Sequence, residues 1–143
     1  MKAVKQILAG KPAQVFSVSP QTTVFEALEV MMTKNISALA IMENMALKGI
    51  FTERDYARKI ILKGKSSKDT PVSEVMTSEV ITISPDDSID YCMKLMTDRH
   101  IRHLPVVENN SVCGMVSIGD VVKSIIEAQK STIEQLESYI KSY

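Results

Sequence analysis

Hydrophobic and polar positions follow two periods along this chain, and each period predicts one kind of element. Short β-favouring runs, "VFSV" at 15–18 and "VITI" at 80–83, are both followed by Ser-Pro, which cannot continue a strand ladder. After each run, apolar residues recur at the i, i+3, i+4, i+7 spacing of a helix with one buried face. These residues are Val24, Ala27, Leu28 and Met31, and then Ile89, Cys92, Met93 and Met96. Thr23 and Ser88 stand where a helix N-cap is expected.

Two further apolar runs follow in each half of the chain. "ALAIM" and "LKGIF" flank the turn segment "ENMA", and "HLPVV" and "VCGMV" flank "ENNS". Both groups predict a β-hairpin. A second helix is predicted from Thr52 in the first half and from Ser117 in the second. Each half therefore has the predicted order β-α-β-β-α, and the polar segment "KGKSSKDTPVSE" joins the two.

The two halves align without a gap, because each residue number in the second half exceeds its partner by 80 − 15 = 65. Gly49 then aligns with Gly114 and Asp55 with Asp120, which indicates a duplicated unit. Two copies are too few for a solenoid, so we expect each copy to bury one face against the other. We divide the chain into a first repeat with an N-terminal extension (1–64), a linker (65–79), a second repeat (80–126) and a C-terminal amphipathic helix (127–143).

The last segment of the chain carries an apolar stripe of its own. Its members lie at helical spacing among Glu and Lys residues: Ile126, Ile133, Leu136, Ile140 and Tyr143. We expect this stripe to dock either on its own domain or on a second subunit.

Composition and charge narrow the function classes. The 143 residues, nearly half of them apolar, are enough for one compact folded domain. Lys plus Arg and Asp plus Glu each number 17, so no overall field attracts nucleic acid or an anionic membrane. The N-terminus lacks a signal peptide and the apolar runs are short, so we expect a cytoplasmic protein without a membrane span.

Catalytic and metal-binding patterns are missing from the sequence. Cys92 and Cys113 each lie in an apolar pattern, so we expect buried free thiols and not a disulfide, a metal site or a nucleophile. No metal-ligand spacing, Gly-rich phosphate loop or nucleophile–base pair is found. We therefore expect no catalytic residue, no metal and no catalytic cofactor.

The predicted second helices begin with one shared motif, Thr52-x-x-Asp55 and Ser117-x-x-Asp120. One interpretation is a capping box, in which the hydroxyl caps the helix and the acid reaches back to the cap N–H. A capping box favours the longer Glu or Gln, so the short Asp is expected to stay freer for hydrogen bonds from outside the helix. At a helix N-terminus such a carboxylate is well placed to accept from the vicinal hydroxyls of a ribose, while nearby N–H groups face a phosphate.

The duplicated unit, the segments "GIFTERD" and "GMVSIGD" and the segment "HIRHLPVV" resemble the tandem cystathionine-β-synthase (CBS) domain pair, or Bateman module, from about 15 to 126. The resemblance implies an α+β fold, in which two tandem β-α-β-β-α CBS repeats pack sheet to sheet as a pseudo-twofold module with two clefts. It also implies a ligand that contains adenosine, and AMP, ADP, ATP, NAD and S-adenosylmethionine all share that group.

The resemblance also assigns roles to residues. Asp55 and Asp120 would hold ribose hydroxyls, and Thr52 and Ser117 would support the ribose or phosphate. Because the family's clefts are shared between the copies, Asp55 is expected to face one set of residues in the second copy: Thr82, Ile101, Arg102 and His103. Asp120 is expected to face the matching set in the first copy: Ser17, Ile36, Ser37 and Ala38. The adenine would lie against these segments.

The two expected clefts differ in charge. Arg54, Arg58, Arg102 and His103 gather at the Asp55 cleft, and arginine presents a planar fork that suits phosphate oxygens. The other cleft has Ser37, Ala38 and Gly119 instead, and the first copy departs further with Ala40 in place of Pro105. We therefore expect the Asp55 cleft to bind a nucleotide phosphate, and the Asp120 cleft to be weaker, to bind a less charged group or to be empty. A solvated helix face for Arg58 and Lys59, and a structural histidine at position 103, are the other interpretations.

Together these expectations favour a non-catalytic sensor that binds an adenine nucleotide and changes the geometry of a homodimer or of an unidentified protein partner. A constitutive dimerisation scaffold with vestigial clefts is the alternative of a different class. An enzyme is the weakest hypothesis, because the two repeats account for nearly the whole chain.

Overall fold

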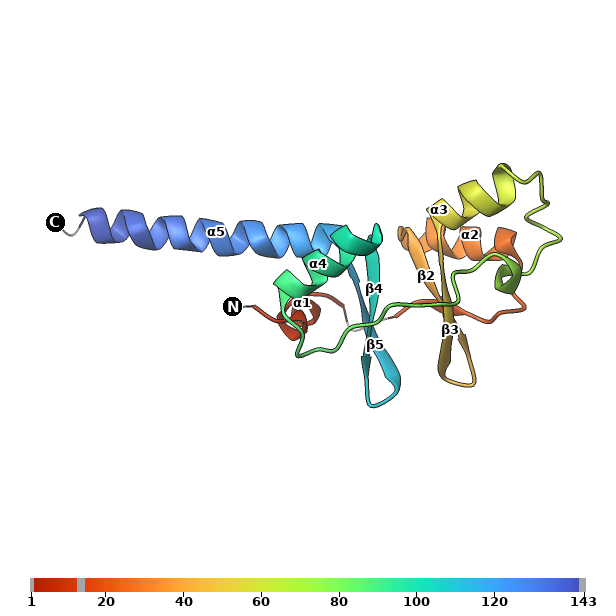
Figure 1. The fold of residues 1–143 in the computed structure, drawn as a ribbon, viewed down its shortest axis with the longest axis horizontal. Coiled ribbons are helices and arrows are strands. Elements are labelled where there is room, and N and C mark those ends of the chain that lie inside the picture. Colours follow the sequence, from red (N-terminus) through yellow and green to blue (C-terminus); the bar gives the residue numbers. More distant parts are fainter. Residues whose placement is uncertain (1, 13–14, 142–143) are drawn as a thin grey trace.

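The computed structural model describes residues 2–12 and 15–141, and it contains the two copies in chain order (Figure 1). The first copy consists of β1 (Ser17–Val18), α2 (Val24–Lys34), β2 (Ala38–Glu43), β3 (Ala46–Thr52) and α3 (Glu53–Tyr56), which continues as the π-helix η1 (Ala57–Ile61). The second contains α4 (Ile89–Arg99), β4 (His103–Glu108), β5 (Ser111–Ser117) and α5 (Ile118–Lys141). The helix α1 (Val4–Ala9) precedes the first copy, and the 3₁₀ turn η2 (Val72–Glu74) precedes the second. The predicted α+β pair of repeats is confirmed.

The two sheets differ in one strand, and Pro105 explains the difference. In the first copy β1 pairs in parallel with β2, which pairs antiparallel with β3. In the second copy only β4 and β5 form a sheet, and the run at 80–83 makes one isolated bridge to β4. Ala40 donates its N–H to the Phe16 carbonyl at 3.4 Å, whereas Pro105, its partner in the alignment, has no N–H to donate. The prediction of a full first strand in the second copy is therefore wrong.

Each copy is completed by the segment that precedes the other copy in sequence. Val4 lies in the hydrophobic core of the second copy, and its N–H donates to the Asp87 carbonyl at 2.9 Å. Val72 lies in the core of the first copy, and its N–H donates to the Thr22 carbonyl at 2.7 Å. Thr22 and Asp87 are partners at the 65-residue offset, so the two contacts have equivalent acceptors. The N-terminal extension, grouped with the first copy by its place in the chain, thus packs against the second.

We call these two segments, the one around α1 and the one from Val72 to Thr77, the exchanged segments. They explain why both copies carry a glycine at the same point, Gly49 and Gly114. A Cβ added to Gly49 would lie 2.6 Å from Sδ of Met76 and 2.8 Å from the Thr77 carbonyl, in the segment that leads into the second copy. A Cβ added to Gly114 would lie 2.5 Å from Cδ2 of Leu8 in α1. Only the missing side chain lets the exchanged segments approach this closely.

The helix α5 begins on the second copy and then leaves it. Val121 and Ser124 are buried in its first turns, but every described residue from Ile126 to Lys141 is exposed. Figure 1 shows this half of α5 projecting from the body as a rod. The apolar stripe is therefore not docked on its own domain over the described residues, and Tyr143 lies outside them. Within the part of the chain that the structure describes, no helix is long and apolar enough to cross a membrane.

The two cysteines are free thiols with different surroundings. Cys92 is buried, and burial, together with the nearby charge of Asp87, raises the pKa of its thiol to about 11. Cys113 is exposed, so the prediction of a buried thiol is wrong at this position. The reason is its place in β5. Neighbouring residues of a strand face opposite sides of the sheet, and because Gly114 faces α1, Cys113 faces away from it.

Candidate functional site

Two aspartates occupy equivalent points of the two copies, in the first turn of the helix that follows each hairpin. Asp55 opens α3 directly after β3 and is only 7 % exposed, and Asp120 opens α5 directly after β5. Each helix start is also tied to the strand entrance of its own copy. The N–H of Glu53 donates to the Ser37 carbonyl at 3.3 Å, and the N–H of Ile118 donates to the Arg102 carbonyl at 2.8 Å.

Both motifs form capping boxes. Oδ2 of Asp55 accepts from the N–H of Thr52 at 3.0 Å, while the N–H of Asp55 donates to Oγ1 of Thr52 at 3.1 Å. The same two bonds join Ser117 and Asp120 at 2.9 and 3.2 Å. The capping-box interpretation is therefore confirmed, and the expectation that the short Asp would be freer for bonds from outside the helix is wrong for Oδ2, which accepts from the cap N–H in both copies. A ligand has to use what remains of each carboxylate.

At Asp55 the remaining oxygen, Oδ1, is held by an ammonium and a hydroxyl. Nζ of Lys59, one helical turn further on, lies 3.1 Å from Oδ1 and also donates to the Val75 carbonyl at 2.9 Å. The hydroxyl of Thr77 donates to the same Oδ1 at 3.2 Å. Val75 and Thr77 belong to the segment that leads into the second copy, so this carboxylate ties the helix to the exchanged segment.

At Asp120 the ammonium comes from the other side of the junction. Nζ of Lys11, just after α1, lies 2.8 Å from Oδ2 of Asp120 and donates to the Met115 carbonyl at 2.8 Å. Met115 aligns with Ile50, whose carbonyl accepts from the N–H of Thr77 at 2.8 Å, so Lys11 takes the place that Thr77 has in the first copy. Lys59 in turn aligns with Ser124. The lysine therefore comes from the helix itself at Asp55 and from the exchanged segment at Asp120.

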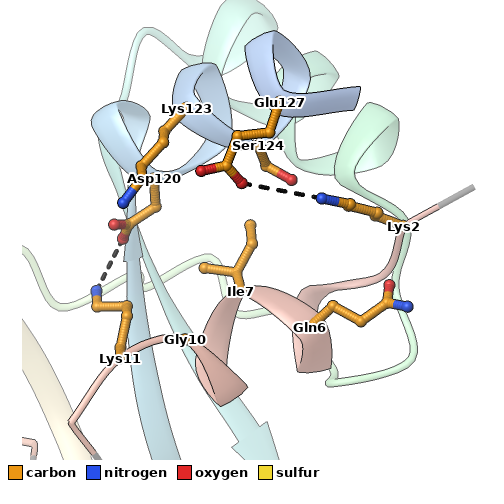
Figure 2. Close-up of a pocket in the computed structure, with 9 residues that line it drawn as sticks. All are labelled: Lys2, Gln6, Ile7, Gly10, Lys11, Asp120, Lys123, Ser124 and Glu127. Atoms are coloured by element: carbon orange, nitrogen blue, oxygen red, sulfur yellow. Dashed lines mark hydrogen bonds and ion pairs between the residues drawn. The ribbon is translucent and has the colours of Figure 1, made fainter. Parts of the chain in front are cut away.

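Figure 2 shows the hollow between α1 and α5 beside Asp120, about 190 Å³ in volume. Lys11 and Lys123 lie on either side of Asp120, and the nearly buried Ser124 lines the same space. Burial alone would raise the pKa of Asp120. Hydrogen bonds from Lys11 and Ser117, with the charge of Lys11, outweigh burial and hold that pKa below its ordinary value.

Two hydrogen bonds join the copies near these sites. Nη1 of Arg54 donates to the His100 carbonyl at 2.7 Å, at the end of α4. Oγ of Ser37 lies 3.0 Å from Nε2 of His103, at the entrances of β2 and β4. Burial lowers the pKa of His103, and nearby Lys11 and Arg102 add to this, although Asp120 works in the opposite direction. His103 is thus a half-buried histidine held between the copies.

This geometry can be compared with known proteins. The family model for the CBS domain matches residues 4–62 and 72–127. The chain belongs to the CBS domain family. It carries two CBS repeats, and the order of elements and the duplicated motif agree with that assignment.

Relatives and solved structures of CBS proteins agree with the fold. The CBS domain-containing protein CBSX3, mitochondrial, of Arabidopsis thaliana is 44 % identical over 124 residues, which are 83 % of this chain and 60 % of that protein. A CBS-domain protein from Burkholderia ambifaria superposes with a TM-score of 0.86 at 44 % identity, covering 90 % of this chain and 96 % of that one. The CBS domain pair of protein MJ0100, solved with 5′-methylthioadenosine and S-adenosyl-L-methionine, superposes with a TM-score of 0.77 at 27 % identity, covering 87 % of this chain and 99 % of that one.

The other predicted site residues of the CBS pair lie where β2 and β4 begin or on the surface nearby. Those at the strand entrances are Ile36, Ser37 and Ala38 in the first copy and Ile101, Arg102 and His103 in the second. Ser17 on β1, Thr82, Arg58 and Arg102 are exposed. Among the described residues, the hydrogen bonds bring Ser37 to His103, but none joins Asp55 to Thr82 or Asp120 to Ser17.

Sequence reasoning missed three partners of the two aspartates. Lys59 was open to detection, because an acid and a base four residues apart face each other on a helix. No sequence pattern indicates Lys11 or Thr77. Each lies far from its aspartate in the sequence, and it contacts the aspartate because its segment packs on the other CBS repeat.

Proposed function

We propose that this CBS pair is a non-catalytic regulatory module of the cytoplasm that binds an adenine nucleotide, namely AMP, ADP, ATP or NAD, between its two repeats. The observation that carries the proposal is the pair of equivalent carboxylates, Asp55 and Asp120, each at a helix N-terminus. Such a position suits a ribose diol next to a phosphate. The MJ0100 pair, which was solved with two adenosine-containing ligands, supports the ligand class.

The two aspartates would meet a ribose differently. Oδ1 of Asp55 already accepts from Lys59 and Thr77, so a diol has to displace at least one of them. Among the described residues, Oδ1 of Asp120 receives no hydrogen bond, so a ribose hydroxyl can donate to it without breaking a contact. We therefore propose that ribose binding at Asp55 requires the Lys59 side chain to move. Ribose binding at Asp120 requires no side chain to move.

The phosphate-binding groups in this proposal are the cations around each aspartate. Arg58 and Arg102 are exposed, and they are available to a phosphate in the cleft of Asp55. Lys11 and Lys123 lie beside Asp120. The Asp120 cleft is therefore more positive than the alignment of the two repeats predicted, and it differs less in charge from the Asp55 cleft. We still assign the phosphate to the Asp55 cleft, because arginine binds phosphate oxygens with two parallel hydrogen bonds.

Regulation in this proposal acts through a homodimer and through a protein partner of unknown identity. A nucleotide changes their arrangement only if it binds one arrangement more tightly than the other. Arg54 with His100 and Ser37 with His103 are the contacts through which such a change would pass between the copies.

Thermal unfolding tests the proposal. We would measure the midpoint against AMP, ADP, ATP, NAD and S-adenosylmethionine, for the wild type and for Asp55→Ala and Asp120→Ala. A ligand at about a hundred times its dissociation constant adds roughly 2.7 kcal/mol to the free energy of unfolding. We expect one nucleotide to raise the midpoint, and Asp55→Ala to remove most of that shift. No shift with any of the five ligands would contradict the proposal.

Two observations favour the second candidate, a constitutive scaffold. Both aspartates are used in capping boxes, and the exposed half of α5 has an apolar stripe. A scaffold predicts that the protein dimerises in the same way with and without every nucleotide tested.

A further inference from the structure

The exposed half of α5 carries an apolar stripe with a strict seven-residue period. Ile126, Ile133 and Ile140 recur at one heptad position, and Leu136 at the other, with exposed fractions between 55 and 70 %. Gln129 is the polar member of the second position, seven residues before Leu136. In heptad notation the isoleucines are a residues, and Gln129 and Leu136 are d residues.

Among the described residues, no side chain in this half of the helix is buried against the body of the protein. This half runs for about 24 Å beyond the body. Isolated helices of such a length are marginal in water, because most helix stability comes from packing of an apolar face. A seven-residue apolar repeat is the pattern that a second helix of the same kind covers.

We propose that the exposed half of α5 pairs in parallel, as a two-stranded coiled coil, with α5 of a second copy of this chain. The inference rests on the proposed homodimer and names its contact surface and direction. Isoleucine at the a position with leucine at d favours two parallel strands.

Gln129 decides the direction of the pair. In a parallel pair each Gln129 meets the other, and two amides can donate to each other. In an antiparallel pair Gln129 faces Ile140, and its amide is buried without a partner. The antiparallel pair would bring Lys130 near Glu137, but exposed ion pairs contribute less than a buried unpaired amide costs. In the parallel pair the charged e residues face g residues without charge, such as Thr132, so no like charges meet.

Sedimentation equilibrium of the full chain tests the surface. Ile133→Asp places a charge in the stripe and is expected to raise the dimer dissociation constant at least about a hundredfold. Ser131→Asp, which adds the same charge on the far face of the helix, is the matched control and should leave the constant within about threefold. An unchanged constant in Ile133→Asp, with helix content retained by circular dichroism, would overturn the proposal.

Disulfide cross-linking tests the direction. In a Cys113→Ser background, where the remaining Cys92 is buried, Gln129→Cys should give a covalent dimer on mild oxidation, and Ser131→Cys should not. An antiparallel pair would hold the two 129 positions about 16 Å apart, too far for a disulfide. It would cross-link only when Gln129→Cys is mixed with Ile140→Cys, and that result would overturn the parallel arrangement.

The nucleotide proposal and the coiled-coil proposal can be tested independently of each other. The midpoint shift with nucleotide is measured on Ile133→Asp as well, and a retained shift with a lost dimer supports the coiled coil independently of the nucleotide. No shift in any variant contradicts only the nucleotide proposal.

Discussion

Lys11 and Asp120 lie at opposite ends of the chain, and their side chains meet in an ion pair 2.8 Å long. The contact joins the segment before the first CBS repeat to the helix that ends the second. Its counterpart at Asp55 uses Lys59, which comes from the helix itself. Both carboxylates therefore carry a lysine that ties the helix to an exchanged segment.

Removal of the Lys11 ammonium should change how stability depends on pH. The pKa of Asp120 is held below its ordinary value, so its contribution to stability is present above the ordinary pKa and is lost as the pH falls through the lower folded value. Lys11→Met should cost at most about 1 kcal/mol at neutral pH, because the pair is partly exposed. Urea unfolding at pH 7 and near pH 3 measures the difference, which should shrink at the lower pH. Lys5→Met is the control, since its pair with Asp86 is more exposed; an equal pH-dependent loss there would contradict the account.

Gly49→Ala should destabilise the protein by about 1–3 kcal/mol, because the new methyl group would lie against Met76 and the Thr77 carbonyl. Denaturant unfolding measures the loss. Gly10→Ala is the matched control, since a Cβ there meets only the Ile7 carbonyl, at 3.6 Å. Equal stability of the two variants would show that the exchanged segment does not approach Gly49 as described.

His103 should make the protein less stable as the pH falls below the ordinary histidine pKa of about 6.5. Burial lowers its pKa, so between the unfolded and the folded pKa the unfolded chain binds more protons, and stability drops with falling pH. His103→Gln should flatten this dependence between pH 7 and pH 5, measured by thermal unfolding. His100→Asn is the control, because asparagine tolerates the positive φ of 55° at that position. If stability in His103→Gln still falls with pH as in the wild type, His103 is not the source of this dependence.

Pro105→Ala should extend the bridge at 80–83 into a strand like β1, since the new N–H can donate as that of Ala40 does to Phe16. Amide hydrogen exchange is the measurement, with new protection expected at position 105. Free exchange of that amide in the folded protein would show that another feature prevents the strand.

Most of the fold could be predicted because its signals are local and occur twice. The helices α2 and α4 begin after the predicted caps Thr23 and Ser88, whose hydroxyls accept from backbone N–H groups in the first turn. Both hairpins also formed where the turn segments predicted them. The first strand of the second copy was predicted wrongly. The run at 80–83 favours a strand, but the hydrogen bond it needs would come from the N–H of residue 105 on β4, and that residue is a proline.

The candidate site was predictable in its two aspartates and not in their partners. A Ser/Thr-x-x-Asp motif at the start of a helix can be found by eye, but it fits a cap as well as a ligand, and the structure shows that the cap is made. Lys11 and Thr77 reach the aspartates because the segments before the repeats change places. Such an exchange depends on packing between distant parts of the chain, and the pattern of either segment alone does not indicate it.

Binding of a nucleotide that lacks the ribose hydroxyls tests directly whether the two aspartates hold the ribose. Isothermal titration calorimetry would compare the nucleotide that gives the largest thermal shift with its 2′,3′-dideoxy analogue, for the wild type, Asp55→Ala and Asp120→Ala. Loss of one charge-assisted hydrogen bond corresponds to roughly 1.5–3 kcal/mol, so the wild type should bind the analogue at least about tenfold more weakly. We predict that Asp55→Ala binds the two ligands nearly equally. If the wild type does not distinguish them, or if both variants still do, the aspartates do not hold the ribose.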